Sequence, residues 1–304
     1  PTAITWPYAL QDHQTIASSP YPCQQPVNCY DTTYVFCVNA GHSAPLCSTS
    51  FDGGITWTPE ISGAPDGCNS GGLTGHIVGS PNGNFYRGNP GCDGSGYSAY
   101  RSTDGGFEWT EHPLPTAETG TADTWNFEEL AVATDEEDNV HALWMGSGNR
   151  PWYAWSGDEG ATWSEPLMVA PPGLNGTGFP TIAGGADGRV VFGYIGESNH
   201  SEWSGYMGII TDAYADNPLI TTVAVNARAD MLDDTEDCGS VRCGGFGDFI
   251  DVVIDKQGRP WIALAHNPGN QEGIVGTLVT GPRLRGPLEA LPPIVPGGPE
   301  TLGL

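Results

Sequence analysis

The chain has 304 residues, including 44 glycines and 26 prolines, and its formal net charge is −26. Glycine and proline are unfavourable inside helices, while the frequent tyrosines and tryptophans favour strands, so the composition predicts an all-β protein of short strands and tight turns. The negative charge repels phosphate backbones and anionic lipids, which excludes nucleic acids and membrane surfaces as expected partners. No apolar segment is long enough to span a bilayer.

Five repeated units are predicted along the chain, each starting with an inner strand that is followed by a second strand. Glycine-containing turns at 81–84, 186–189 and 256–259 separate the two strands in three of the units. Third strands are expected at 206–211 and 274–279 in the last two units. The predicted pairs of inner and second strands are 14–18 and 34–38, 76–79 and 84–87, 129–133 and 141–145, 181–184 and 190–195, and 249–254 and 260–266.

One turn motif, S-x-D-x-G-x-x-W, occurs three times without gaps, with its aspartates at Asp52, Asp104 and Asp158. The spacings of 52 and 54 residues indicate a repeat architecture. The aspartate can accept hydrogen bonds from N–H groups of its own turn, and the glycine supplies the positive φ that the turn needs. The tryptophan is expected to begin the next strand as a large apolar anchor. Each copy is therefore predicted to be a self-capped hairpin turn.

This motif resembles the Asp-box, or BNR repeat, of bacterial sialidase-like β-propellers, and the strand pattern extends the resemblance over residues 12–285. The resemblance implies a single propeller of four-stranded antiparallel blades. It also implies that each box lies at the periphery between the third and fourth strands of a blade. Asp52, Asp104 and Asp158 would then be structural rather than catalytic.

The number of units favours five blades, and six blades is the alternative because sialidases usually have six. The fifth unit lacks an obvious fourth strand, for which residues 3–8 and residues 287–295 are the two candidates. The propeller is assigned to residues 1–285. Residues 286–304, which are rich in proline and glycine, are predicted to be a C-terminal tail.

The eight cysteines form four pairs of sequence neighbours, whose connectivity the sequence leaves open. No CxxC pair or neighbouring histidine cluster supports a metal site, so disulfides are the favoured interpretation. Disulfides persist in oxidising compartments, which predicts an extracellular, periplasmic or cell-surface protein. The neighbours are Cys23 and Cys29, Cys37 and Cys47, Cys68 and Cys92, and Cys238 and Cys243.

The inner strands of a propeller converge on its axis, so the residues that precede them are expected at one mouth, opposite the boxes. Carboxylates and imidazoles there could act as acids and bases, and glycoside hydrolysis requires two carboxylates. Glu128, Glu129 and Asp248 are the catalytic candidates. The competing interpretation is that such groups only cap strand starts around a water-filled channel. The candidate substrate-binding residues are Asp12, His13, His76, Trp125, Asn126, Arg150 and Arg242.

The arginines limit how far the sialidase resemblance extends, because sialidases hold the substrate carboxylate with an arginine cluster. Arg189 and Arg259 fall in turns on the side away from the mouth, and the family's N-terminal Arg-Ile-Pro motif is absent. No tyrosine–glutamate nucleophile pair can be assigned by motif, so sialidase activity is not the favoured prediction. The arginines that loops could bring to the mouth are Arg87, Arg150, Arg228 and Arg242.

The long connection 226–247 is acidic and contains Cys238 and Cys243. Loops of this length are usually functional or disordered. Because Ca²⁺ prefers oxygen ligands, a calcium site is one hypothesis, although the spacing of an EF-hand is missing. A solvated run of charge is the competing interpretation. The candidate metal ligands are Asp233, Asp234, Glu236 and Asp237.

Together these features predict a secreted, sialidase-like propeller that binds or hydrolyses a carbohydrate at its axial mouth. A glycoside hydrolase is the expected class if the protein is an enzyme. The alternative is a non-catalytic propeller that binds another surface protein, and a polysaccharide lyase is a third interpretation. The expected partner is therefore a glycan or a surface protein, and Ca²⁺ is the candidate cofactor.

Overall fold

The computed structural model describes residues 11–20, 30–40, 45–68, 70, 75–94, 96–115, 130–146, 148, 150–198, 202–226, 231–232, 250–266 and 272–294. These residues contain nineteen β-strands and no helix, as the composition predicts. The strands form five antiparallel sheets, four of four strands and one of three. Each sheet follows chain order from its inner to its outer strand.

The first two sheets hold two copies of the turn motif. The first consists of β1 (Gln11–Pro20), β2 (Thr32–Ala40), β3 (Leu46–Ser50) and β4 (Ile61–Ser62). The second consists of β5 (Val78–Gly79), β6 (Phe85–Pro90), β7 (Tyr97–Ser102) and β8 (Thr110–Pro113).

The remaining three sheets follow the same order. The third consists of β9 (Leu130–Thr134), β10 (Val140–Gly146), β11 (Arg150–Ser156) and β12 (Leu167–Met168). The fourth consists of β13 (Gly176–Gly184), β14 (Val190–Glu197), β15 (Trp203–Ile210) and β16 (Ile220–Ala224). The fifth consists of β17 (Asp251–Ile254), β18 (Pro260–His266) and β19 (Glu272–Thr277).

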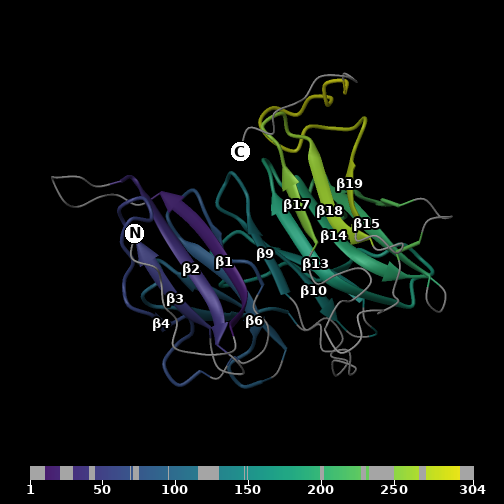
Figure 1. Cartoon of the computed structure of the whole chain (residues 1–304). Coiled ribbons are helices and arrows are strands. Elements are labelled where there is room, and N and C mark those ends of the chain that lie inside the picture. The colour runs from purple at the N-terminus through teal and green to yellow at the C-terminus, as the bar shows by residue number, and fades with distance from the viewer. Residues whose placement is uncertain are drawn as a thin grey trace.

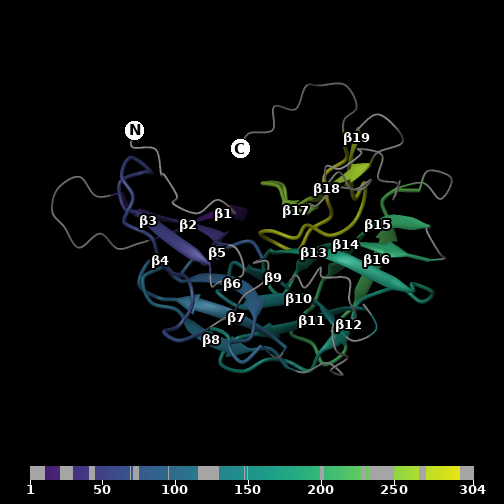
Figure 2. The ribbon, with the colours of Figure 1, turned by 60° about the horizontal axis from the view of Figure 1, so that its bottom comes forward.

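The five sheets are the blades of a propeller (Figure 1). The inner strands β1, β5, β9, β13 and β17 contact one another in series, and Figure 2 shows the outer strands of the first four blades turned away from them. The predicted five-bladed, all-β fold is thereby confirmed. The fifth blade has three strands in the described part of the chain, because residues 3–8 lie outside it and residues 287–294 do not pair with β19.

Glycines allow the inner strands of adjacent blades to touch through their backbones. A Cβ atom on Gly79 would lie 2.1 Å from the carbonyl oxygen of Ser18, and one on Gly75 would lie 2.0 Å from that of Leu130. Any larger residue at these positions would push two blades apart. The first three blades are thus in main-chain contact beside the axis.

The faces of the blades bury the apolar side chains. Tyr153 of the third blade and Phe192 of the fourth belong to one fully buried cluster, and Val191 and Ile262 join the fourth blade to the fifth in another. Both faces of a central blade are therefore covered. This explains why strands such as β10 and β14 consist of almost continuously buried residues.

Two of the expected disulfides are present in the described residues. Cys37 and Cys47 are register partners on β2 and β3 and form one bond, and Cys68 and Cys92 form the other. The interpretation of these four cysteines as disulfide-bonded is confirmed. The other four, Cys23, Cys29, Cys238 and Cys243, lie outside the described residues.

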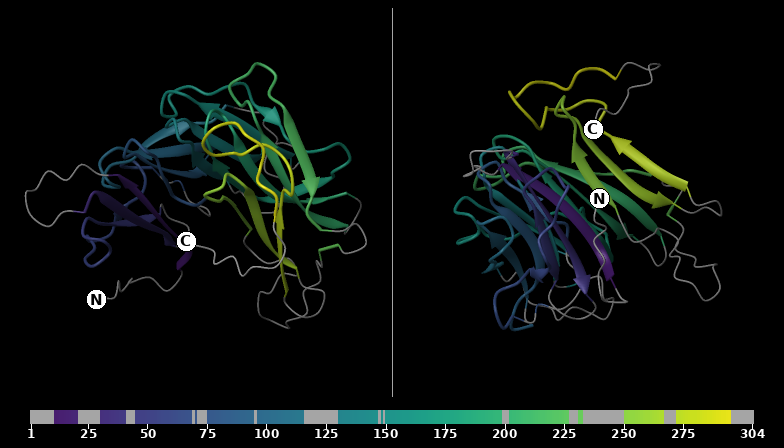
Figure 3. Two further views of the ribbon diagram at one scale, coloured as in Figure 1. Left: turned by 90° about the horizontal axis from the view of Figure 1, so that it is seen from above. Right: turned by 60° about the vertical axis from the view of Figure 1, so that its left-hand side comes forward.

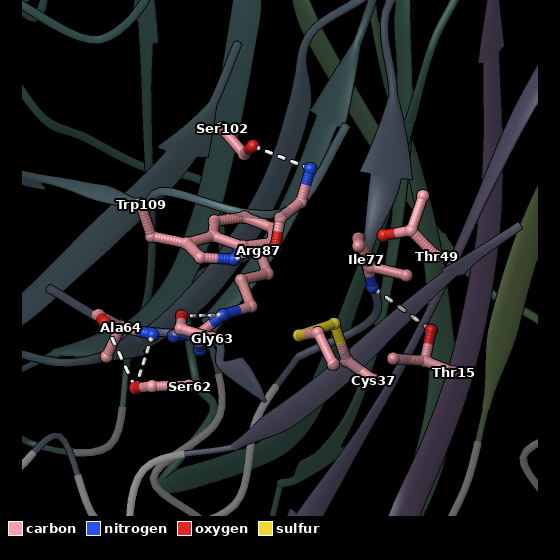
Figure 4. Close-up of a disulfide and its surroundings, with 12 residues drawn as sticks. Thr15, Cys37, Thr49, Ser62, Gly63, Ala64, Ile77, Arg87, Ser102 and Trp109 are labelled. Atoms are coloured by element: carbon pink, nitrogen blue, oxygen red, sulfur yellow. Dashed lines mark hydrogen bonds between the residues drawn. A yellow bond between two sulfur atoms is a disulfide. The ribbon is translucent and has the colours of Figure 1, made fainter. Parts of the chain in front are cut away.

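Arg87 is completely buried near the first disulfide, beside the indole ring of Trp109 (Figure 4). Its Nε donates a hydrogen bond to the carbonyl of Gly63 at 2.8 Å. Its guanidinium carbon lies 4.6 Å from the centre of the Tyr100 ring and 5.3 Å from that of Trp109. Burial lowers the pKa of Arg87 to about 9. Arg87 joins the first two blades, so the expectation that it reaches the mouth is wrong.

The three S-x-D-x-G-x-x-W turns are built in the same way. In the second, Ser102 Oγ donates to Asp104 Oδ1 at 2.8 Å and accepts from the N–H of Gly106 at 2.8 Å. The other two have equivalent bonds at Ser50, Asp52 and Gly54 and at Ser156, Asp158 and Gly160. All three turns connect the third strand of a blade to the fourth, as the resemblance implies. Trp109 directly precedes β8, whereas Trp57 and Trp163 lie four residues before β4 and β12.

Candidate functional site

A cavity of about 530 Å³ lies on the axis and is lined by the inner strands of all five blades. Residues 14–18, 75–79, 130–134, 179–184 and 250–252 contribute one segment each. A sixth contribution comes from Arg285, which follows the last strand. Because every blade reaches this cavity, it is the place where the fold brings distant parts of the chain together.

The wall of the cavity combines polar and apolar groups and carries few charged side chains. Its apolar part includes exposed Ile16 and partly buried Val78. The ionisable groups in the described lining are those of His76, Asp251 and Arg285. Polar groups that fix a ligand's orientation, set beside apolar surface, are typical of small-molecule sites.

Two of the inner strands are irregular at the mouth end of the cavity. The register of β1 shifts between Asp12 and Thr15, and that of β13 shifts between Gly178 and Thr181. Within the second shift Phe179 has a φ of 53°, which is uncommon for a bulky residue. β-Bulges redirect side chains and are frequent beside active sites. Here the bulge is followed directly by Thr181, which contacts the last blade.

Asp251 is an exposed carboxylate in the cavity wall, on the first residue of β17. The hydroxyl of Thr181 donates to Asp251 Oδ1 at 3.0 Å, and the backbone N–H of Val252 donates to the same oxygen at 2.9 Å. These bonds hold one oxygen in place, so the fourth and fifth blades position the carboxylate together. The sequence interpretation missed Asp251, although it lies on a predicted inner strand three residues after Asp248.

Of the predicted substrate-binding residues, His76 is the one that the structure places in the cavity wall, where its side chain is exposed. Arg150 begins β11 in the middle of the third blade and does not line the cavity. Asp12 and His13 lie on β1, at the mouth end of that strand. Glu128, Glu129, Asp248, Trp125, Asn126 and Arg242 lie outside the described residues. Leu130 and Ile250, which follow Glu129 by one residue and Asp248 by two, do line the cavity.

The candidate calcium ligands Asp233, Asp234, Glu236 and Asp237 also lie outside the described residues. Within the part of the chain that the structure describes, no three His, Cys, Asp or Glu side chains are placed to hold a metal ion. The same described residues include no helix that could cross a membrane.

The aspartates of the three turn motifs are remote from the cavity wall. Hydrogen bonds from the hydroxyl and backbone N–H of Thr56 hold the pKa of Asp52 below its ordinary value. Hydrogen bonds from the hydroxyl and backbone N–H of Thr162 lower the pKa of Asp158 in the same way. These carboxylates are engaged within their own turns, which agrees with the structural role that the resemblance implies.

No protein-family model and no curated protein matches the chain. Among solved structures, a protein of unknown function from Dyadobacter fermentans aligns with a TM-score of 0.57 and 14% identity, over 90% of this chain and 78% of that one. The Hadza microbial sialidase Hz136 aligns with a TM-score of 0.49 and 12% identity, over 88% of this chain and 52% of that one. The K499G mutant of NanB sialidase from Streptococcus pneumoniae aligns with a TM-score of 0.47 and 11% identity, over 76% of this chain and 34% of that one.

The chain thus spans about half of the Hadza sialidase and about a third of NanB. At these identities the similarity to the Dyadobacter protein shows a shared fold alone. Sialidases are among the proteins whose structures this chain resembles, and what they act on is a property of those proteins.

Proposed function

We propose that this chain is a secreted, sialidase-like propeller of the Asp-box type that binds a carbohydrate at the mouth of its axial cavity. The observation that carries the proposal is the cavity itself, in whose mixed polar and apolar wall Asp251 and His76 are exposed. Its volume of about 530 Å³ falls within the roughly 300–1,000 Å³ usual for ligand pockets.

At the mouth, the chemistry of the wall suits a sugar ring better than an anionic ligand. The Asp251 carboxylate accepts hydrogen bonds, and His76 can donate or accept them, as sugar hydroxyls require. Apolar side chains such as Ile16 and Val78 can cover the C–H face of a ring. The net charge of −26 adds repulsion against polyanionic ligands.

Binding is the primary proposal, and hydrolysis requires an additional condition. Glycoside hydrolysis needs two carboxylates, whereas Asp251 is the one carboxylate in the described lining. Hydrolysis would need Glu128 or Glu129 and Asp248 at the same mouth. Their nearness in sequence to the lining residues Leu130 and Ile250 supports that assignment.

A glycan array and a panel of chromogenic glycosides test the proposal. Wild-type protein is expected to retain at least one glycan, and D251N is expected to lose it. D216N is the matched control, because Asp216 is exposed and lies outside the cavity. Retention of the glycan by D251N would reject this site, and silence of the wild type in both assays would reject carbohydrate binding.

Protein binding is a second candidate function, favoured by apolar side chains on the fifth blade. Val253 is 52% exposed, Val275 66% and Val279 65%, and exposed apolar groups gathered in one region are typical of interaction surfaces. Cross-linking to candidate surface proteins, with V275D as the variant, tests this function. If V275D and the wild-type protein bind the partner equally well, protein binding through this surface is contradicted.

A further inference from the structure

We infer that the axial cavity contains a second site, at the end opposite the mouth, where Arg285 binds the carboxylate group of a ligand. Arg285 lines the cavity, is exposed, and belongs to the segment 278–294 that follows β19. Figure 3 shows this segment, in yellow, beyond the end of the last blade. The inference does not depend on carbohydrate binding at the mouth.

The segment is docked against the turns on the side away from the mouth. The N–H of Leu284 donates to the carbonyl of Gly258 at 2.7 Å, and the carbonyl of Leu284 accepts from the N–H of Ala186 at 2.8 Å. Gly258 lies in the turn between β17 and β18, and Ala186 in the turn between β13 and β14. The Leu284 side chain is completely buried between these two blades. Arg285 therefore enters the cavity from its far end.

The backbone on both sides of Arg285 is held by another arginine. The buried guanidinium of Arg189 donates to the carbonyl of Arg283 at 2.8 Å and to that of Gly286 at 2.5 Å. Arg259 donates to the carbonyls of Leu278 and Pro292, near the two ends of the segment. The backbone around Arg285 is thus held in place before a ligand arrives, which lowers the entropy cost of binding.

Arg285 differs from five of the six other described arginines in what surrounds it, and the sixth, Arg150, does not line the cavity. Arg87, Arg189 and Arg259 donate to backbone carbonyls in buried positions. Arg101 pairs with Glu159 and Arg283 with Glu289, so their charges are matched. No described carboxylate pairs with Arg285 in this way.

These observations define the chemistry of the ligand. A guanidinium presents parallel N–H groups that match a carboxylate, and such charge-assisted pairs are stronger than neutral hydrogen bonds. In a chain with ten basic and thirty-six acidic residues, a guanidinium that lines a cavity and that no described carboxylate matches is a local reversal of the overall charge. A carboxylate on a small molecule, whether a sugar acid or an aliphatic acid, fits this position.

Calorimetric or NMR titration of the whole chain tests the site with three probes. D-glucuronate and succinate carry carboxylates on different frames, and D-glucose is the uncharged match to glucuronate. Saturable binding of at least one acid is expected, with R285Q at least about tenfold weaker because a charge-assisted bond is lost. Binding of both acids identifies a general carboxylate site, and binding of glucuronate alone identifies a sugar-acid site.

Three further variants keep the outcome unambiguous. R150Q removes an arginine that does not line the cavity and should bind as the wild type does. R285K keeps the charge but not the paired donors, so its affinity for the acids should lie between those of the wild type and R285Q. D251N alters the mouth and should still bind the acids, which separates this site from the proposed glycan site. Failure of both acids to bind the wild type, or equal binding by R285Q, would overturn the inference.

Discussion

His141 Nε2 donates a hydrogen bond to Asp135 Oδ2 at 3.0 Å, and both side chains are completely buried. The hydroxyl of Tyr214 donates to the same oxygen, and that of Tyr153 lies 2.7 Å from His141 Nδ1. Tyr214 follows the third strand of the fourth blade, so this carboxylate connects that blade to the third. The Asp135–His141 pair is closed to solvent and therefore supports the fold.

Asp135 should give the protein a specific sensitivity to acid. Burial favours a higher pKa for Asp135, but the bonds from His141 and Tyr214 outweigh it and lower the pKa to about 2. A group with a lowered pKa stabilises the fold above its unfolded value of 3.8, and this contribution disappears as pH falls toward 2.

We expect D135N to cost about 2 kcal/mol at pH 7, since each pKa unit corresponds to about 1.4 kcal/mol. The difference from the wild type should shrink between pH 5 and pH 2, as urea unfolding curves at several pH values would show. D216N, at an exposed position, should stay close to the wild type throughout. A gap between D135N and wild type that is constant over this range would refute the assignment.

Ser102 should matter to stability more than its small side chain suggests. Its buried Oγ accepts the hydrogen bond of the Gly106 N–H, which is also buried. S102A leaves that donor without its partner and is expected to cost about 1–3 kcal/mol. T103A, on the exposed Thr103 of the same turn, is the control and should cost less. Thermal unfolding of the two variants measures the difference, and equal midpoints would contradict this account of the turn.

Arg189 should hold the segment 278–294 in place. R189Q removes buried donors to Arg283 and Gly286 and should expose the segment to protease within the folded protein. Loss of charge-assisted bonds of this kind costs about 1.5–3 kcal/mol each. Limited proteolysis followed by mass spectrometry locates the cut. R150Q serves as the control. If protease first cuts R189Q at a site outside residues 278–294, the segment does not depend on Arg189.

Glu129 provides the test of hydrolysis. If the mouth cleaves glycosides, E129Q should abolish turnover while the thermal midpoint stays nearly unchanged, because the substitution preserves shape and removes an acid. Turnover is followed with a glycoside that the wild type cleaves. An active E129Q would remove Glu129 from the catalytic candidates and leave Glu128 to be tested in the same way.

The strands could be predicted because their signals are local. The predicted second strand 260–266 coincides with β18, and the glycine turns that flank the inner strands fall where they were expected. The predicted strand begins at residue 181, five residues after the observed start of β13 at Gly176. A bulge with Phe179 at positive φ interrupts the alternation of side chains between the two faces of the strand. Periodicity cannot show a bulge that packing against another blade stabilises.

The site was less predictable because its members come from distant parts of the chain. His76 could be placed from its position beside an inner strand, and Asp251 was available by the same reasoning. Arg285 could not be predicted by that reasoning, because its place depends on Leu284, which docks between turns that lie about 26 and 98 residues earlier. No local pattern encodes such a contact.

The contacts of Gly75 and Gly79 with neighbouring backbones have a further consequence for how this protein can change. Where main chain touches main chain, no side chain is left to adjust the spacing, so the distance between the first three blades is set by the backbone itself. A larger residue at Gly75 or Gly79 would separate these blades rather than reshape the cavity by small steps. Variation in ligand preference is therefore expected in the side chains that line the cavity and in the loops at its two rims, while the spacing of these blades stays constant.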